Sequence, residues 1–140
     1  RVARIEQNNE AFKSGYTDPR FGTIEYTGFS GNSGPLAAPG SVDFVLTFRN
    51  IHNWMSGGYE QKFFNDAYAA LKPGGVFSIG MKLDQDDGRD RMGRMYSYYS
   101  AAELEQHLTD AGFTIADRSL GRGKGLDGSY SDWIVILSHG

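Results

Sequence analysis

Four polar side chains that could carry chemistry follow directly after an apolar run, VDFVLTF, at residues 42–48. They are Arg49, Asn50, His52 and Asn53. An arginine guanidinium can hold a carboxylate through two parallel hydrogen bonds. A histidine imidazole, whose unperturbed pKa is about 6.5, can accept a proton from a hydroxyl or an amine near neutral pH. The cluster therefore predicts a site that binds an anionic group and orients or deprotonates a nucleophile.

Each of these residues also has a purely structural interpretation. Arg49 could be a surface charge, and Asn50 could order the backbone of a loop. His52 could cap the helix that follows or pack against Trp54. The sequence leaves both interpretations open.

The elements around the cluster form one βαβ unit. VDFVLTF is a nearly continuous apolar run of strand length, which is typical of a strand buried on both faces of a parallel sheet. Apolar residues at helical spacing predict a helix over residues 58–72, and the Lys-Pro-Gly-Gly turn at 72–75 ends it before a strand at 76–83. Ligands of open α/β sheets sit at the carboxyl ends of the strands, where this polar cluster lies.

The N-terminal part predicts a helix, a strand and a long connection. Val2, Ile5 and Phe12 lie near one face of a helix over residues 1–14. Residues 22–27 alternate enough to be a short strand, and a Gly- and Pro-rich stretch then forms an irregular loop as far as residue 40.

The C-terminal part predicts a helix followed by a hairpin. Ser100 and Glu103 form a capping box at the start of a helix, and Gly112 fits the left-handed position that ends it. Strands at residues 114–119 and 132–138 have too few residues between them for a crossover helix, so they run antiparallel.

Composition restricts the partners. The chain has 140 residues, 39% of them hydrophobic, and is treated as a single α/β domain or part of one. A net charge of −3 gives no general attraction to nucleic acid or anionic lipid, and no apolar run reaches the ~20 residues of a membrane span. Cysteine is absent, which excludes thiolate chemistry. We expect a cytoplasmic protein that acts on a small molecule.

Three further groups of residues could suggest a metal or phosphate site, but their spacing argues against one. The acids between residues 84 and 90 lack the spacing of a calcium loop, so we expect a solvated loop and no metal. Glycines 121, 123 and 125 join two strands and precede no helix, so a hairpin is favoured over a phosphate cradle. His107 and His139 have no companion at metal-ligand spacing, and we expect both to be structural or exposed.

Several motifs together resemble class I S-adenosylmethionine-dependent methyltransferases. VDFVLTFRNIHNW resembles the family's fourth motif, LKPGGVFSIG its fifth strand, and YSAAELEQHLTDAGFTIADRS the following helix and sixth strand. TFRNIHNW is similar to a group of bacterial predicted methyltransferases. The resemblance implies a Rossmann-like sheet whose parallel strands end in an antiparallel C-terminal hairpin.

The resemblance also implies roles for individual residues. Thr47, Phe48 and Arg49 would contact the methionine end of S-adenosylmethionine, and Gly28 and Phe29 would contact its adenine. Phe29 could equally fill the core. The residues expected to position the reacting groups are His52 and Asn50, and those expected to face the substrate are Asn53, Tyr96 and Tyr98. The tyrosines belong to a charged segment, residues 84–99, that could cover the site or be an ordinary exposed loop.

One departure from the family is important. The family has a Gly-rich turn after its first strand and an acidic residue after its second, and neither is visible in this sequence. In the family's sheet order, 3-2-1-4-5-7-6, strands 1 and 2 would then be missing, and residues 1–14 would be the helix before strand 3. The strand at residues 42–48 would then have an unpaired edge, which favours pairing with a strand of another chain. A rearranged pairing, a partner chain such as a second copy, or an upstream segment of a longer protein would each close it, and we expect the upstream segment.

Two functions are consistent with these residues and with the resemblance. The first is methyl transfer from S-adenosylmethionine to a small-molecule nucleophile. The second is a non-catalytic binding or assembly module that keeps half of the fold. A nicotinamide-dependent oxidoreductase is disfavoured because no G-x-G-x-x-G turn lies between a strand and a helix.

Overall fold

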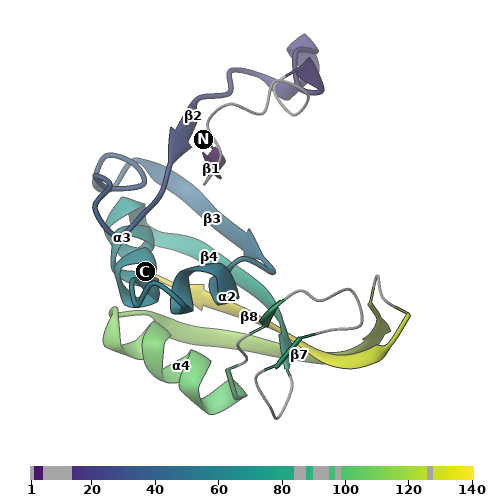
Figure 1. Ribbon diagram of the computed structural model, residues 1–140. Helices are drawn as coiled ribbons and strands as arrows, with labels where there is room; N and C mark the ends of the chain where they lie inside the picture. The colour runs from purple at the N-terminus through teal and green to yellow at the C-terminus, as the bar shows by residue number, and fades with distance from the viewer. Residues whose placement is uncertain (1, 5–13, 84–87, 90–94, 97–98, 126–127) are drawn as a thin grey trace.

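The computed structural model describes residues 2–4, 14–83, 88–89, 95–96, 99–125 and 128–140 (Figure 1). Its centre is a four-stranded sheet of β3 (Val42–Phe48), β4 (Leu71–Leu83), β7 (Thr114–Lys124) and β8 (Tyr130–His139), in the order β3-β4-β8-β7. β3 pairs with β4 in parallel, and β8 is antiparallel to both β4 and β7. The parallel unit followed by an antiparallel hairpin confirms the predicted sheet.

Three helices pack on one face of this sheet (Figure 1). They are α2 (Ile51–Met55), α3 (Glu60–Ala70) and α4 (Ala101–Asp110). Their buried side chains meet those of β4 and β8 in a single core, whose fully buried members include Phe64, Phe77, Ile79, Leu104, Leu108, Ile134 and Ile136. None of the helices in the described part of the chain is long and apolar enough to cross a membrane.

The opposite face of β3 is open to solvent. Phe44, Leu46 and Phe48 are 66%, 61% and 55% exposed, whereas Thr47, on the helix-covered side, is buried. The expectation that this strand is buried on both faces is therefore wrong for the described residues. The reason is that α2, α3 and α4 all lie on the same side.

The N-terminal segment is a strand where a helix was expected. β1 (Val2–Arg4) pairs in parallel with β2 (Tyr26–Gly28), so the predicted helix over residues 1–14 is wrong at residues 2–4. A strand of three residues is too short to show a periodicity of its own, and the pairing that defines it is not local. Residues 5–13 lie outside the described part of the chain.

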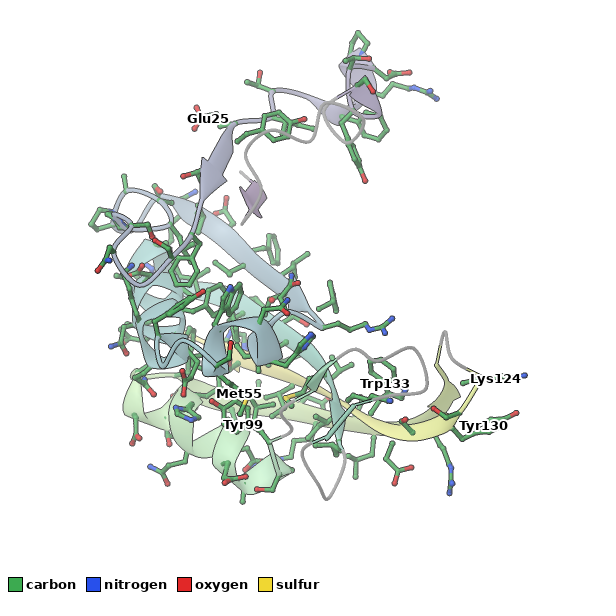
Figure 2. The ribbon with its side chains drawn as sticks, viewed as in Figure 1. Glu25, Met55, Tyr99, Lys124, Tyr130 and Trp133 are labelled. Atoms are coloured by element: carbon green, nitrogen blue, oxygen red, sulfur yellow. The ribbon has the colours of Figure 1, made fainter. Side chains whose placement is uncertain are left out.

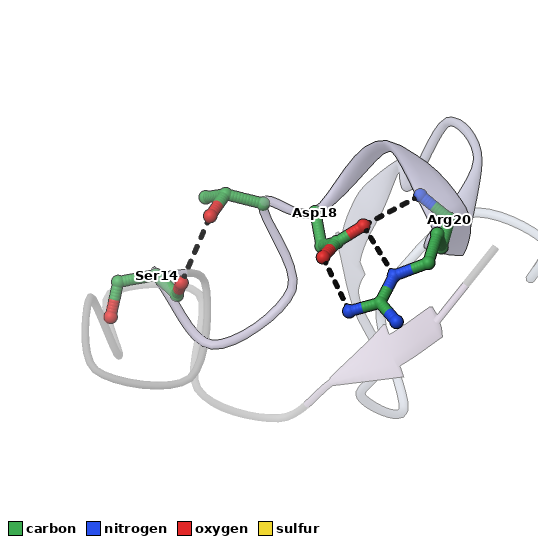
Figure 3. A network of polar contacts seen from close by, with 4 residues as sticks. Ser14, Asp18 and Arg20 are labelled. Carbon is green, nitrogen blue, oxygen red and sulfur yellow. Dashed lines mark hydrogen bonds and ion pairs between the residues drawn. The ribbon is translucent and has the colours of Figure 1, made fainter.

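A short 3-10 helix, η1 (Pro19–Phe21), lies between β1 and β2 in the chain (Figure 3). The Asp18 carboxylate accepts hydrogen bonds from Arg20 through the backbone nitrogen at 2.9 Å, Nε at 3.0 Å and Nη2 at 2.7 Å. These bonds favour the charged form and lower the pKa of Asp18. Nearby, the Thr17 hydroxyl donates to the carbonyl of Ser14 at 3.2 Å.

Several element boundaries differ from the expected ones. The LKPGG segment belongs to β4, because Leu71 pairs with Val42 before the register shifts at a bulge. The polar stretch after β3 is not a simple loop, since Ile51–Met55 form α2. The hairpin strands β7 and β8 extend into the glycine-rich stretch that was expected to be a loop. The capping box at Ser100 is confirmed, with Glu103 Oε2 accepting from the Ser100 nitrogen at 2.9 Å.

Gly112 offers a direct test of how α4 ends. It has a φ of +105°, and a Cβ there would lie 2.9 Å from Cζ of Tyr68. We expect Gly112→Ala to lower the free energy of unfolding by about 1–3 kcal/mol, because the backbone is strained for an L residue. Chemical denaturation measures this change.

Gly121→Ala is the matched control. Gly121 has no positive φ, and a Cβ there meets nothing within 4 Å. Its stability should stay unchanged or rise slightly. Equal effects of the two substitutions would contradict a special role for Gly112.

Candidate functional site

The polar cluster lies where the sheet's parallel strands end. Arg49 directly follows β3, and its backbone nitrogen donates to the carbonyl of Gly80 in β4 at 2.9 Å. Arg49 is also a non-glycine residue with a positive φ, 60°. Such a backbone is strained and is frequent at binding sites. The chain thus turns sharply as it leaves the sheet, at the edge expected to hold a ligand.

The Arg49 side chain stacks on an aromatic ring that no sequence motif singled out. Its guanidinium carbon lies 5.2 Å from the ring centroid of Trp133, on β8. Figure 2 shows Trp133 where the β7–β8 hairpin leaves the body, with Lys124 and Tyr130 farther out. A cation over an indole face gains about 0.5–1 kcal/mol at an exposed position. Within the described part of the chain, no carboxylate pairs with this guanidinium, so it remains able to bind an anion.

The next residues belong to a short helix. Asn50 is the N-cap of α2 without a side-chain capping bond, while its carbonyl accepts from the nitrogen of Asn53 at 3.0 Å. Asn50 and Asn53 are exposed and His52 is half-buried. Arg49, Asn50, His52 and Asn53 thus lie in the turn after β3 and in the first part of α2.

The last two residues of β3 point to opposite faces. Thr47 is 5% exposed, and its hydroxyl has no hydrogen-bond partner among the described residues. Phe48 is exposed on the other side, and its ring lies over Gly80, where a Cβ would come within 2.8 Å of Cδ1. Gly80 is thus needed for the position of the Phe48 ring. No local pattern in the sequence indicates this contact, because it depends on strand register.

Phe29 packs in an aromatic cluster. It is 4% exposed, and its ring centroid lies 5.2 Å from that of Trp54 and 5.6 Å from that of Phe63. The Lys62 ammonium lies 4.9 Å above the ring. This is the core-filling role that the sequence left open beside adenine stacking. Gly28, the residue before it, ends β2.

A buried polar group to which no sequence motif points lies between α3 and α4. Tyr99 is 5% exposed, and neither its hydroxyl nor Oε2 of Glu60 makes a hydrogen bond of normal geometry within the described chain. Burial raises the pKa of Tyr99, and the nearby negative charge of Glu60 raises it further. The His107 ring lies 4.9 Å from the Tyr99 ring, and its Nδ1 is 2.6 Å from Oε1 of Gln61. His107 is therefore structural, as expected.

The remaining predicted residues are only partly described. Tyr96 belongs to β6 (Met95–Tyr96), which pairs with β5 (Gly88–Arg89), and only its backbone is described. Tyr98 and the acids at 84, 86, 87 and 90 lie outside the described residues. Among the residues that are described, no group of three or more His, Asp or Glu side chains could hold a metal ion.

The fold matches solved structures across almost the whole chain. No protein-family model matches the sequence, and no curated protein does. A protein from Methanosarcina mazei described as a SAM-dependent methyltransferase is 18% identical with a TM-score of 0.76, over 99% of this chain and 81% of that one. The Burkholderia thailandensis 1,6-didemethyltoxoflavin-N1-methyltransferase, with its substrate and S-adenosylhomocysteine bound, is 17% identical with a TM-score of 0.67, over 98% of this chain and 59% of that one.

A third similar structure carries another name. The [4+2]-cyclase SpnF is 12% identical with a TM-score of 0.66, over 99% of this chain and 66% of that one. At these identities the similarity establishes the fold, which is that of class I S-adenosylmethionine-dependent methyltransferases, as the sequence predicted. The reaction has to be argued from the site, because one fold hosts different activities.

The strain at Arg49 can be measured with two variants. Arg49→Ala and Arg49→Gly both remove the contact with Trp133, but only alanine keeps the Cβ that disfavours a φ of 60°. We expect Arg49→Ala to be less stable than Arg49→Gly by about 1 kcal/mol in chemical denaturation. Equal stabilities would show that the backbone relaxes without cost.

Tyr99 predicts a pH dependence at the alkaline end. Its pKa is higher in the folded than in the unfolded chain, so it contributes to stability below the ordinary pKa of 10.0, and this contribution is lost as the pH rises above it. We expect Tyr99→Phe to flatten this alkaline loss of stability. At neutral pH it should cost little, because the hydroxyl makes no hydrogen bond of normal geometry within the described chain. A phenolate signal from Tyr99 at or below its ordinary pKa would contradict the prediction.

Proposed function

We propose that the complete protein transfers a methyl group from S-adenosylmethionine to a small-molecule nucleophile. The observation that carries this proposal is the position of Arg49. It presents a cation, paired with no carboxylate of the described residues, at the carboxyl end of β3 in a methyltransferase fold. Several neighbours with this fold are described as methyltransferases, and the one from Burkholderia thailandensis is described with S-adenosylhomocysteine bound.

The donors around the end of β3 suit the methionine end of the cofactor. The Arg49 guanidinium can bind its carboxylate, and stacking on Trp133 limits the directions in which the guanidinium can point. The Thr47 hydroxyl is buried without a partner in the described chain, so it can donate to a ligand at no cost in existing bonds. Gly28 and Phe29 would line the adenine end, with Phe29 held in place by its aromatic neighbours.

The residues at the start of α2 would act on the methyl acceptor. When bound, S-adenosylmethionine supplies a methyl group on a sulfonium, which a nucleophile attacks in line. His52 would accept the proton that the nucleophile loses, and Asn50 would orient the acceptor through its amide. Asn53, Tyr96 and Tyr98 would contribute to the acceptor side. Most of the rate enhancement is expected from alignment rather than from the base.

A binding module without catalysis is the second candidate. It is favoured by the exposed apolar residues of β3, which an isolated enzyme domain would be expected to cover. The presence of a cyclase among the neighbours also shows that the fold alone does not determine the reaction.

Titration with S-adenosylhomocysteine tests the first candidate. We expect Arg49→Ala to weaken binding about 10-fold or more in isothermal titration calorimetry, since a hydrogen bond to a charged group contributes about 1.5–3 kcal/mol. Arg122→Ala is the control, because Arg122 is an exposed arginine on the hairpin whose Nε lies 3.9 Å from Asp132. An unchanged affinity of Arg49→Ala would remove Arg49 from the site.

A second variant separates catalysis from binding. His52→Ala should keep the affinity for S-adenosylhomocysteine while lowering the turnover of a methyl acceptor. The expected reason is the loss of the group that accepts the proton of the nucleophile. Failure of the native protein to bind S-adenosylhomocysteine would instead favour the binding module.

A further inference from the structure

Several buried polar atoms have no hydrogen-bond partner within the described part of the chain. They are the Thr47 hydroxyl, the Trp54 indole nitrogen, Oε2 of Glu60, the Tyr99 hydroxyl and the Ser138 hydroxyl. Buried polar atoms are normally paired, so each of these requires an explanation. The proposed function gives one for Thr47. Glu60 and Tyr99 have no role in it.

Glu60 and Tyr99 lie at the same end of the sheet as Arg49. α3 follows β3 and precedes the parallel strand β4, while α4 follows β4 and precedes β7, which is parallel to β4 because both are antiparallel to β8. Each helix therefore begins at the carboxyl ends of the strands, where open α/β sheets bind ligands. Glu60 is the first residue of α3, and Tyr99 directly precedes the N-cap of α4.

The two side chains are close to each other. Burial and, after it, the negative charge of Glu60 raise the pKa of the Tyr99 phenol, and this effect of charge requires a short separation. Tyr99 is almost fully buried, whereas Glu60 as a whole residue is only half-buried. The pair thus lies just beneath the surface of the protein and not in the centre of its core.

The end of α2 borders this pair. The rings of Trp54 and Phe63 have centroids 4.2 Å apart, and Phe63 lies on the same face of α3 as Glu60, three residues before it. In the view of Figure 2, Met55 at the end of α2 lies next to Tyr99, and both side chains pack in the same core. The pair is therefore next to the helix that carries His52.

The charge around the pair is negative. Glu103, in the first turn of α4, also raises the pKa of Tyr99 through its charge. Within the described residues, no ion pair joins Glu60 to a lysine or an arginine. Buried charges are normally paired, so this environment favours a positively charged ligand. An ammonium group is also attracted to aromatic rings such as those of Trp54 and Tyr99.

We propose that Glu60 and Tyr99 bind a basic amino group of the methyl acceptor, so that the acceptor is a small amine. This inference rests on the proposed function, because it takes the ligand at this end of the sheet to be the methyl acceptor. The Glu60 carboxylate accepts hydrogen bonds from the amino group, and the Tyr99 hydroxyl can accept one more. A buried water molecule between the two side chains is the competing explanation.

Titration with benzylamine, followed by nuclear magnetic resonance, tests the proposal. We expect the native protein to bind benzylamine and Glu60→Gln to weaken the binding about 10-fold or more, because a hydrogen bond between charged groups is lost. Benzyl alcohol, which has the same size and no charge, should bind the native protein about 10-fold more weakly than benzylamine. Glu105→Gln is the matched control and should keep the native affinity, since Glu105 on α4 pairs with Arg118.

A separate titration with S-adenosylhomocysteine distinguishes the acceptor from the cofactor, which also carries an amino group. Glu60→Gln should keep the native affinity for S-adenosylhomocysteine. A loss of that affinity would overturn the inference, because Glu60 would then bind the cofactor. No binding of benzylamine, or equal binding by the native protein and Glu60→Gln, would overturn it in favour of a buried water. Glu60-dependent binding of benzylamine by a protein that does not bind S-adenosylhomocysteine would support the amine site and contradict the proposed reaction.

Discussion

The parallel pairing of β3 with β4 is the constraint on which the rest of the structure depends. It fixes the strand ends, and Arg49 leaves the sheet at a sharp turn whose backbone is held by Gly80. It also decides which side chains face the helices and which face solvent. The same alternation that buries Thr47 exposes Phe44 and Leu46. The candidate site and the solvent-exposed face of β3 are therefore two results of one pairing.

The parts of the fold with strong local signals could be predicted from the sequence. The βαβ unit at residues 42–83, the capping box at Ser100 and the stop at Gly112 all depend on residues near one another in the chain. β1 could not be predicted, because three residues carry no periodicity and its partner lies more than twenty positions away. The exposure of β3 was also missed, since an apolar run gives no information about which elements cover it.

The candidate site shows the same division. The run from Arg49 to Asn53 was found because its members are consecutive and polar after an apolar strand. Trp133 and Gly80 were not, because register across the sheet brings them to Arg49 and Phe48. Tyr99 and Glu60 were missed for a related reason. Their proximity depends on the packing of α3 against α4, which has no signature in either helix alone.

Among the glycines of the hairpin, Gly123 leaves room for the Trp133 ring. Gly121 is the register partner of Trp133, and a Cβ on Gly123 would lie 3.3 Å from the indole nitrogen. The Trp133 indole therefore packs against the backbone of Gly123, and the Arg49 guanidinium lies over the indole ring. A larger side chain at position 123 would displace the Trp133 indole and, with it, the Arg49 guanidinium that lies over the ring. The position of the Arg49 guanidinium is therefore linked, through one indole ring, to a backbone position on a different strand.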